Sequence, residues 1–297
     1  MAAKTITIVS GKGGVGKSSI TASLAILLAK KKRIVTADCD VDAPNLNLVF
    51  GLRSSDFNSW KELQTNEKAR LISMKGIDYK KCIAVCNFGA ISYDGKRKKL
   101  IFNKFLCEGC GSCQLLYPKN IRLVKIKNAR IGIGKTRYGF DIVTGQLKMG
   151  ESGSGKIVTE VKNMAEDIAK KENADLIIAD GAPGIGCPVI ASIQGSDYVI
   201  AVTEPTPSGL SDLKRVLKVV EHFNIPKGIV INQFDINRKF SDKIISFAKK
   251  NKIPVLKKIP YNRSFVNALV AMRPVVEYDK GTIGYFKGIA DFLTKNL

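Results

Sequence analysis

The chain has 297 residues, a hydrophobic content of 45% and a net charge of +22, from 48 Lys and Arg against 26 Asp and Glu. This length exceeds the common size of one domain, and the hydrophobic content is ample for a core. No apolar run approaches the ~18 residues that a membrane span needs, and the chain runs directly into a strand-like segment, so we expect a soluble, cytoplasmic protein.

The positive charge suits a nucleic acid, an anionic membrane or an acidic partner protein. The lysines are spread along the chain, with local runs at Lys30–Arg33 and Lys96–Lys99. We find no interleaved aromatic pattern and no recognition-helix signature, so nucleic acid and membrane are possible partners but not favoured ones.

The first predicted elements are a short strand, Ile6–Val9, and a helix, Ile20–Ala29, joined by a glycine-rich turn. The turn has the spacing G-x-x-x-x-G-K-S of a phosphate-binding loop, in the strand–turn–helix context that such a loop requires. We expect Lys17 to reach the β- and γ-phosphates and Ser18 to hold Mg²⁺. The predicted nucleotide-binding residues are Gly11, Lys12, Gly13, Gly14, Val15, Gly16, Lys17, Ser18 and Ser19.

Lys12 is a second lysine in this loop, and ordinary phosphate-binding loops do not need one there. The run Lys12–Ser18 resembles the deviant loop of the MinD and ParA ATPases. In that family the extra lysine reaches across a dimer to the partner's nucleotide and acts as an arginine finger does. The resemblance implies an ATPase that forms an ATP-dependent homodimer, with Lys12 and Lys17 as catalytic residues.

A second predicted strand, Ile34–Ala37, ends in an acidic segment that contains Asp38 and Asp40. Carboxylates at the C-terminal end of a parallel strand lie beside the phosphate site in doubly wound folds. The resemblance implies that Asp40 is catalytic and orients the attacking water, and that Asp38 lies near Mg²⁺. An acidic turn that caps a helix is the alternative.

The composition changes between about Leu71 and Gly150, where short strands, glycines, basic residues and five of the seven cysteines replace the α/β pattern. We therefore expect an inserted domain at 71–150, dividing a nucleotide-binding domain made of 1–70 and 151–297. Three of the cysteines are separated by two residues each: Cys107, Cys110 and Cys113. With Tyr117-Pro118 after them they resemble the bacterial ferredoxin run C-x2-C-x2-C-x3-C-P, in which Tyr117 replaces the last cysteine.

Cys82 and Cys86 resemble the end of a first such run, whose other two cysteines are absent. In two-cluster ferredoxins the fourth cysteine of each run ligates the cluster of the other run. We therefore predict one [4Fe–4S] cluster and a non-ligand Cys82. The four predicted ligands are Cys86, Cys107, Cys110 and Cys113. A zinc site and disulfides are alternatives.

Downstream of the insert, Leu176–Asp180 is a buried-strand pattern that ends in a carboxylate, as in the second acidic motif of phosphate-loop ATPases. We expect Asp180 to hold Mg²⁺ through water and Gly181–Gly184 to act as a second switch. By the same family resemblance, Asn232 reads the adenine base and the loop that contains Pro260 packs on it.

Strands and helices alternate through the rest of the chain, which predicts an α/β fold with a doubly wound, mostly parallel sheet and a small ferredoxin-like insert. The predicted strands are Tyr198–Val202, Gly228–Asn232 and Ile253–Leu256, and the predicted helices are Ile157–Lys171, Ser208–His222 and Lys239–Lys250.

The chain as a whole resembles MinD-superfamily ATPases with an inserted ferredoxin domain. Our leading hypothesis is an ATP-driven redox switch that acts on an unidentified redox or acceptor protein. A carrier or assembly scaffold for iron–sulfur clusters is one alternative. A positioning ATPase with a structural cluster is the other.

Overall fold

The computed structural model describes residues 2–297, and the chain divides into two compact units. The core unit contains the chain up to Trp60 together with Ile131–Gln146 and Ser154–Leu297. The inserted unit contains Lys61–Arg130 and Leu147–Gly153. Residues 131–146, which lie inside the interval 71–150, thus belong with the core unit, because their two strands extend its sheet.

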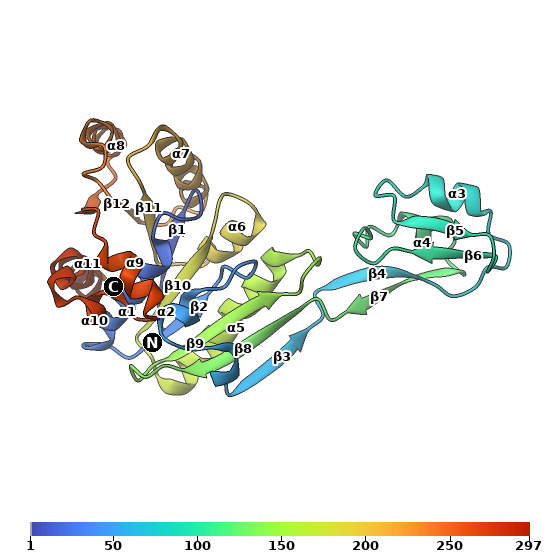
Figure 1. The fold of residues 1–297 in the computed structure, drawn as a ribbon, viewed down its shortest axis with the longest axis horizontal. Coiled ribbons are helices and arrows are strands. Elements are labelled where there is room, and N and C mark those ends of the chain that lie inside the picture. The colour runs from blue at the N-terminus through green and yellow to red at the C-terminus, as the bar shows by residue number, and fades with distance from the viewer. Residues whose placement is uncertain (1) are drawn as a thin grey trace. The chain divides into compact units, whose positions relative to one another are not determined.

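A nine-stranded sheet forms the centre of the core unit (Figure 1), in the order β13-β12-β11-β1-β10-β2-β9-β8-β3. Six neighbouring pairs, from β13 through to β9, are parallel. The central strands are buried on both faces, which explains their nearly continuous apolar sequences. The strands are β1 (Lys4–Ser10), β2 (Ile34–Asp38), β3 (Ser59–Leu63), β8 (Ala129–Lys135), β9 (Asp141–Leu147), β10 (Leu176–Pro183), β11 (Tyr198–Thr203), β12 (Lys227–Asn232) and β13 (Val255–Ile259).

Helices cover both faces of this sheet, as expected for a doubly wound fold. Alternate residues of β11 and β12 enter two separate cores, because successive side chains of a strand point to opposite faces. The helices are α1 (Lys17–Ala29), α2 (Leu46–Val49), α5 (Ser154–Glu172), α6 (Cys187–Ile193), α7 (Pro207–His222), α8 (Arg238–Lys250), α9 (Ser264–Val270), α10 (Val275–Tyr278) and α11 (Ile283–Asn296), with short 3₁₀ turns η1 (Ser54–Asp56) and η2 (Lys280–Thr282).

The C-terminal helix α11 is amphipathic and buries its apolar face against the sheet. Phe286, Ile289 and Leu293 belong to the same core as residues of α1. Of the helices in residues 2–297, none combines the length and the apolar character that crossing a bilayer requires.

The inserted unit is built from two small antiparallel sheets and two short helices. Strand β4 (Asn66–Leu71) pairs with β7 (Ile121–Ile126), and β5 (Ile91–Asp94) pairs with β6 (Lys99–Phe102). The helices are α3 (Tyr79–Ala84) and α4 (Ser112–Leu116). Its main cluster of buried residues consists of Cys82, Ile91, Leu100, Cys113 and Ile121, with partly buried hydrophobic residues packed around it; this core is small for a unit of this length.

We predict that Phe50→Ala destabilises the core unit by about 3–5 kcal/mol, because truncating a buried ring leaves a cavity. Phe50 is 1% exposed, and its ring centroid lies 5.3 Å from that of Phe140. Chemical denaturation measures the free energy of unfolding. Val270→Ala is the control, since Val270 is 82% exposed, and a change of more than about 0.5 kcal/mol there would contradict this reasoning.

Candidate functional site

The glycine-rich loop connects β1 to α1 at the C-terminal edge of the sheet, where nucleotides bind in doubly wound folds. Gly14 and Gly16 have φ angles of +80° and +88°, which glycine adopts without strain. A Cβ at Gly16 would lie 2.6 Å from the amide nitrogen of Asn232. That amide nitrogen, Nδ2, donates a hydrogen bond of 2.9 Å to the carbonyl of Val15. Asn232 therefore fixes the loop from the end of β12.

Lys17 and Asp180 form a buried ion pair beneath the loop, with 2.9 Å between Nζ and Oδ1. Burial lowers the pKa of Lys17, but attraction to Asp180 outweighs it and the pKa is raised overall. Apart from this ion pair, the Lys17 ammonium makes no hydrogen bond of good geometry with residues 2–297. Its remaining donors are therefore available to an anionic ligand such as a phosphate.

The hydroxyl of Ser18 donates a 2.6 Å hydrogen bond to Oδ2 of Asp180, and Thr21 donates one of 2.8 Å to Oδ1. A hydroxyl beside a buried carboxylate provides the hard oxygen donors that Mg²⁺ prefers. Thr21 was not among the residues predicted from the sequence. It lies one helical turn after Lys17, so the i, i+4 spacing on α1 could have identified it.

Asp38 is fully buried at the end of β2, and burial together with the neighbouring Asp180 carboxylate raises its pKa to about 8. It accepts hydrogen bonds from the backbone N–H groups of Asp40 and Leu46, at 3.2 and 2.9 Å. Asp38 therefore organises the acidic turn. The site concentrates carboxylates around one buried lysine, an arrangement that a divalent cation would stabilise.

Asp40 lines a cavity of about 440 Å³ together with loop residues that include Gly13, Lys17 and Ser18. Burial raises the pKa of Asp40, although Lys17 acts in the opposite direction. Leu48 and Leu269 add apolar surface to this cavity; neither residue was predicted from the sequence.

Pro260 follows β13 and is not among the residues that line this cavity. The prediction that the loop containing Pro260 packs on the adenine base is therefore not reflected in the lining of this cavity.

Lys12 does not point at the Lys17 ion pair. Its ammonium lies 2.6 Å from Oε1 of Glu204 and donates a 3.2 Å hydrogen bond to the hydroxyl of Ser208. Thr206 also donates a hydrogen bond to Glu204 and accepts one from the backbone N–H of Gly209, which caps α7. The second lysine of the loop is therefore held within its own chain by the segment between β11 and α7.

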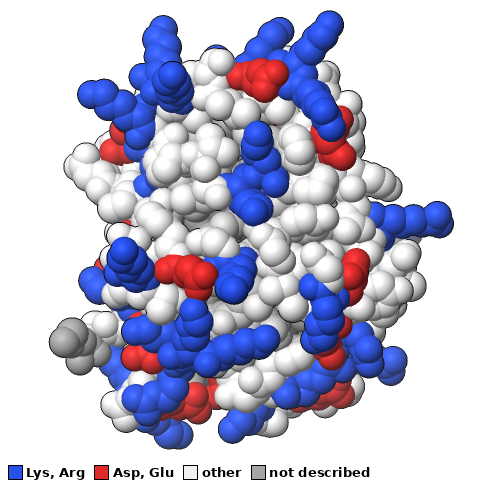
Figure 2. All heavy atoms as spheres, turned by 90° about the vertical axis from the view of Figure 1, so that its left-hand side faces the viewer, with Lys and Arg blue, Asp and Glu red and all other residues white. Residues whose placement is uncertain are grey.

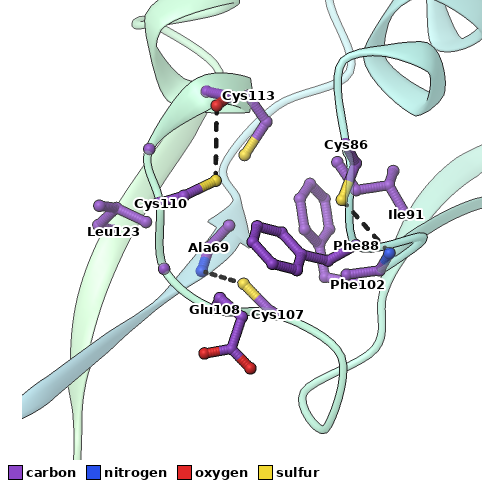
Figure 3. A pocket seen from close by; sticks show the side chains of 14 residues that line it. Ala69, Cys86, Phe88, Ile91, Phe102, Cys107, Glu108, Cys110, Cys113 and Leu123 are labelled. Atoms are coloured by element: carbon purple, nitrogen blue, oxygen red, sulfur yellow. Dashed lines mark hydrogen bonds between the residues drawn. The ribbon is translucent and has the colours of Figure 1, made fainter. Parts of the chain in front are cut away.

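A second candidate site lies in the inserted unit, where four cysteines line one apolar pocket (Figure 3). The pocket is narrow, with a volume of about 20 Å³. Other lining residues include Ala69, Phe88 and Phe102. The four cysteines are Cys86, from the segment after α3, Cys107 and Cys110, from the segment before α4, and Cys113, from the first turn of α4.

The thiols of this pocket accept hydrogen bonds from neighbouring groups. The Ala69 N–H donates to Cys107 Sγ at 3.4 Å, and the Ala90 N–H donates to Cys86 Sγ at 3.3 Å. A hydrogen bond with Ser112 lowers the pKa of Cys110, which favours its thiolate. Burial raises the pKa of Cys113 in the same pocket, so the environment favours the metal-binding thiolate at Cys110 and disfavours it at Cys113.

Cys82 is buried on α3 and is absent from the residues lining the pocket. Burial raises the pKa of Cys82 to about 11, so this thiol stays protonated. Across residues 2–297, no group of three or more His, Cys, Asp or Glu side chains is arranged so that it could hold a metal ion.

Comparison with known proteins places the chain in a nucleotide-binding family. The family model described as the CobQ/CobB/MinD/ParA nucleotide binding domain matches residues 6–275. An uncharacterized protein of Methanocaldococcus jannaschii is 42% identical over 78% of this chain and 79% of its own length. A second from that organism is 33% identical over 97% of both chains. The structure of MinD from Pyrococcus horikoshii with Mg-ADP has a TM-score of 0.57 at 17% identity, covering 98% of this chain and 96% of its own.

We predict that Gly16→Ala lowers nucleotide affinity at least ~10-fold, because the substitution strains a left-handed backbone and displaces Asn232. Titration with a fluorescent ATP analogue measures the dissociation constant. Gly288→Ala is the control: a Cβ there meets nothing within 4 Å, and alanine suits its helix. Equal affinities of the two variants would show that the loop tolerates a side chain at Gly16.

Proposed function

We propose that this chain, which belongs to the CobQ/CobB/MinD/ParA family of nucleotide-binding proteins, hydrolyses ATP with Mg²⁺ and couples that cycle to one [4Fe–4S] cluster in its inserted unit. The observation that carries the proposal is the set of four thiols that line one pocket of the inserted unit. These thiols come from two separate segments, in the combination that the ferredoxin spacing predicts.

The nucleotide half of the proposal rests on the loop between β1 and α1. The backbone N–H groups of the loop and the Lys17 ammonium bind phosphate oxygens. Ser18 and Asp180 provide oxygens for Mg²⁺, with Asp38 buried beside them. When bound, Mg²⁺ neutralises charge that develops on the transferring phosphoryl group. The lysine and the loop amides are in place before the reaction, so catalysis rests on preorganised charge.

Asp40 and Lys12 supply the remaining catalytic functions in this proposal. Asp40 lines the cavity beside Lys17 and Ser18 and accepts a hydrogen bond from the attacking water. Lys12 acts across a homodimer, on the nucleotide of the partner subunit. Within a single chain Lys12 is paired with Glu204. When the dimer forms, Lys12 therefore has to leave this carboxylate before it can bind a phosphate of the partner's nucleotide.

In this proposal the four cysteines are ligands of a cubane cluster and not of a single ion. Four irons occupy a volume, so their thiolates surround a cavity instead of converging on one point. The apolar lining and the N–H groups that donate to Cys86 and Cys107 match this chemistry. When bound, the cluster supplies one-electron transfer, and the four thiolates hold it.

Anaerobic purification followed by iron and sulfide analysis tests the proposal directly. We expect about four irons per chain and an electron paramagnetic resonance signal after reduction. A reduction potential that shifts when ATP is added supports the coupling. Material with zinc in place of iron would contradict the proposal. Rapid transfer of the cluster to an apo-protein, without any ATP-dependent shift, would indicate a carrier instead.

We predict that Lys12→Ala lowers the ATP hydrolysis rate at least ~100-fold, as loss of a trans-acting cation does, while the iron content stays unchanged. Phosphate release measures the rate. Lys4→Ala is the matched control, because Lys4 also makes an ion pair, with Asp197 at 2.9 Å, at the other end of β1. Unaltered hydrolysis by the Lys12 variant would exclude the trans mechanism.

We predict that Cys86→Ala abolishes the [4Fe–4S] signal or reduces it to a three-iron species, because it removes one of four ligands. Cys82→Ala keeps the full iron content, because Cys82 does not line the pocket. Iron analysis and paramagnetic resonance of the two variants measure the difference. A cluster that survives loss of Cys86 but not of Cys82 would reverse the ligand assignment.

A further inference from the structure

The positive charge of this protein is concentrated in the inserted unit. That unit carries seventeen Lys and Arg against six Asp and Glu, so about a quarter of the residues hold half of the net charge of +22. On the face of the molecule seen in Figure 2, by contrast, Lys and Arg are dispersed among uncharged residues and mixed with Asp and Glu. The inserted unit therefore carries more positive charge per residue than the rest of the chain.

A groove of about 790 Å³ crosses the inserted unit, lined by residues of β4, β6 and β7. Its floor is apolar and includes Leu100, Phe102 and Val124. Cationic side chains line it too, among them Arg70, Lys99 and Lys104, which are exposed and form no ion pair with the carboxylates of residues 2–297. An apolar floor with unpaired cations resembles the anatomy of a protein–protein interface.

One cation of the groove is already neutralised. Lys68 is 6% exposed, its ammonium lies 2.7 Å from Oε2 of Glu151, and it also donates to the backbone carbonyl of Lys104. Lys68 therefore holds the return segment Leu147–Gly153 against β4. The exposed cations Arg70, Lys99 and Lys104 can therefore bind an external partner.

The groove adjoins the cysteine pocket. Ala69 and Phe102 line both cavities, and the N–H of Ala69 donates to Cys107 Sγ at 3.4 Å. A protein seated in the groove would therefore contact Ala69, whose backbone is hydrogen-bonded to one of the thiols. Electron transfer requires such proximity, and redox complexes use small, electrostatically guided interfaces of this kind.

We propose that this groove is the docking surface for an acidic protein that exchanges one electron with the inserted unit. This inference rests on the proposed function and deepens it by assigning the partner's class and place. One electron passes between the partner's redox centre and the cluster, with no bond made or broken and no proton moved. Phe102 is the only aromatic residue lining the groove, so the stacking platform of single-stranded nucleic-acid sites is absent from this lining.

Binding of flavodoxin, an acidic protein that carries one electron on a flavin, to the anaerobically purified full chain tests the proposal. We expect binding that weakens with salt. The double variant Lys99→Glu/Lys104→Glu should weaken it at least ~10-fold, since two attractions become repulsions. The matched control Lys80→Glu/Lys81→Glu makes the same charge change on α3, outside the groove, and should weaken binding less than ~3-fold.

Equal losses in the two double variants would show a general effect of net charge and overturn the groove as the docking surface. No binding of flavodoxin at low salt would overturn it as well. Tighter binding of a single-stranded oligonucleotide, lost in the groove variant, would reassign the groove to nucleic acid. Iron is measured in every preparation: an iron-free chain that still bound flavodoxin through the groove would contradict the proposed function but support the docking surface.

Discussion

The buried ion pair between Lys17 and Asp180 is the interaction on which the nucleotide site depends. Charges buried this deeply are costly unless they are paired and hydrogen-bonded, and here Ser18 and Thr21 complete the hydrogen bonding of the carboxylate. The pair forms because strands β1, β10 and β2 are parallel neighbours. The loop after β1, Asp180 of β10 and Asp38 of β2 therefore lie at the same edge of the sheet. The phosphate-binding loop and the acidic turn after β2 both lie next to this ion pair.

The inserted unit is continuous in sequence with helix α5 of the core unit. The return segment from the inserted unit ends at Gly153, and α5 begins at the next residue. Within the core unit, Lys162 of α5 is buried, and its ammonium donates to backbone carbonyls at the end of α6, including that of Ser192 at 2.9 Å. Helix α6 starts directly after the glycine-rich segment that follows β10.

The parts of the fold that the sequence predicts well are those where local pattern and tertiary environment agree. The apolar run ending at Asp180 forms β10, and the glycine-rich turn lies between β1 and α1 as expected. Strand β8 was not predicted from the sequence, because it contains Gly132 and Gly134 and glycines are typical of loops. In the structure these glycines make room for Phe57, and Gly132 also for Trp60: a Cβ at Gly132 would lie 2.9 Å from either ring. The pairing of Lys12 with Glu204 joins residues far apart in sequence, and neither residue's neighbours indicate it.

The small core of the inserted unit has a consequence for how this protein would respond to air. The main cluster of buried hydrophobic side chains in this unit has five members, two of them cysteines, which is a small core for some 77 residues. A cluster bound by Cys86 and by the segment Cys107–Cys113 would act as a covalent staple between two stretches of that unit. Oxygen damage to the cluster would then loosen the inserted unit itself. The sheet of the core unit has its own large interior, so loosening of the inserted unit would leave the fold around the phosphate loop intact.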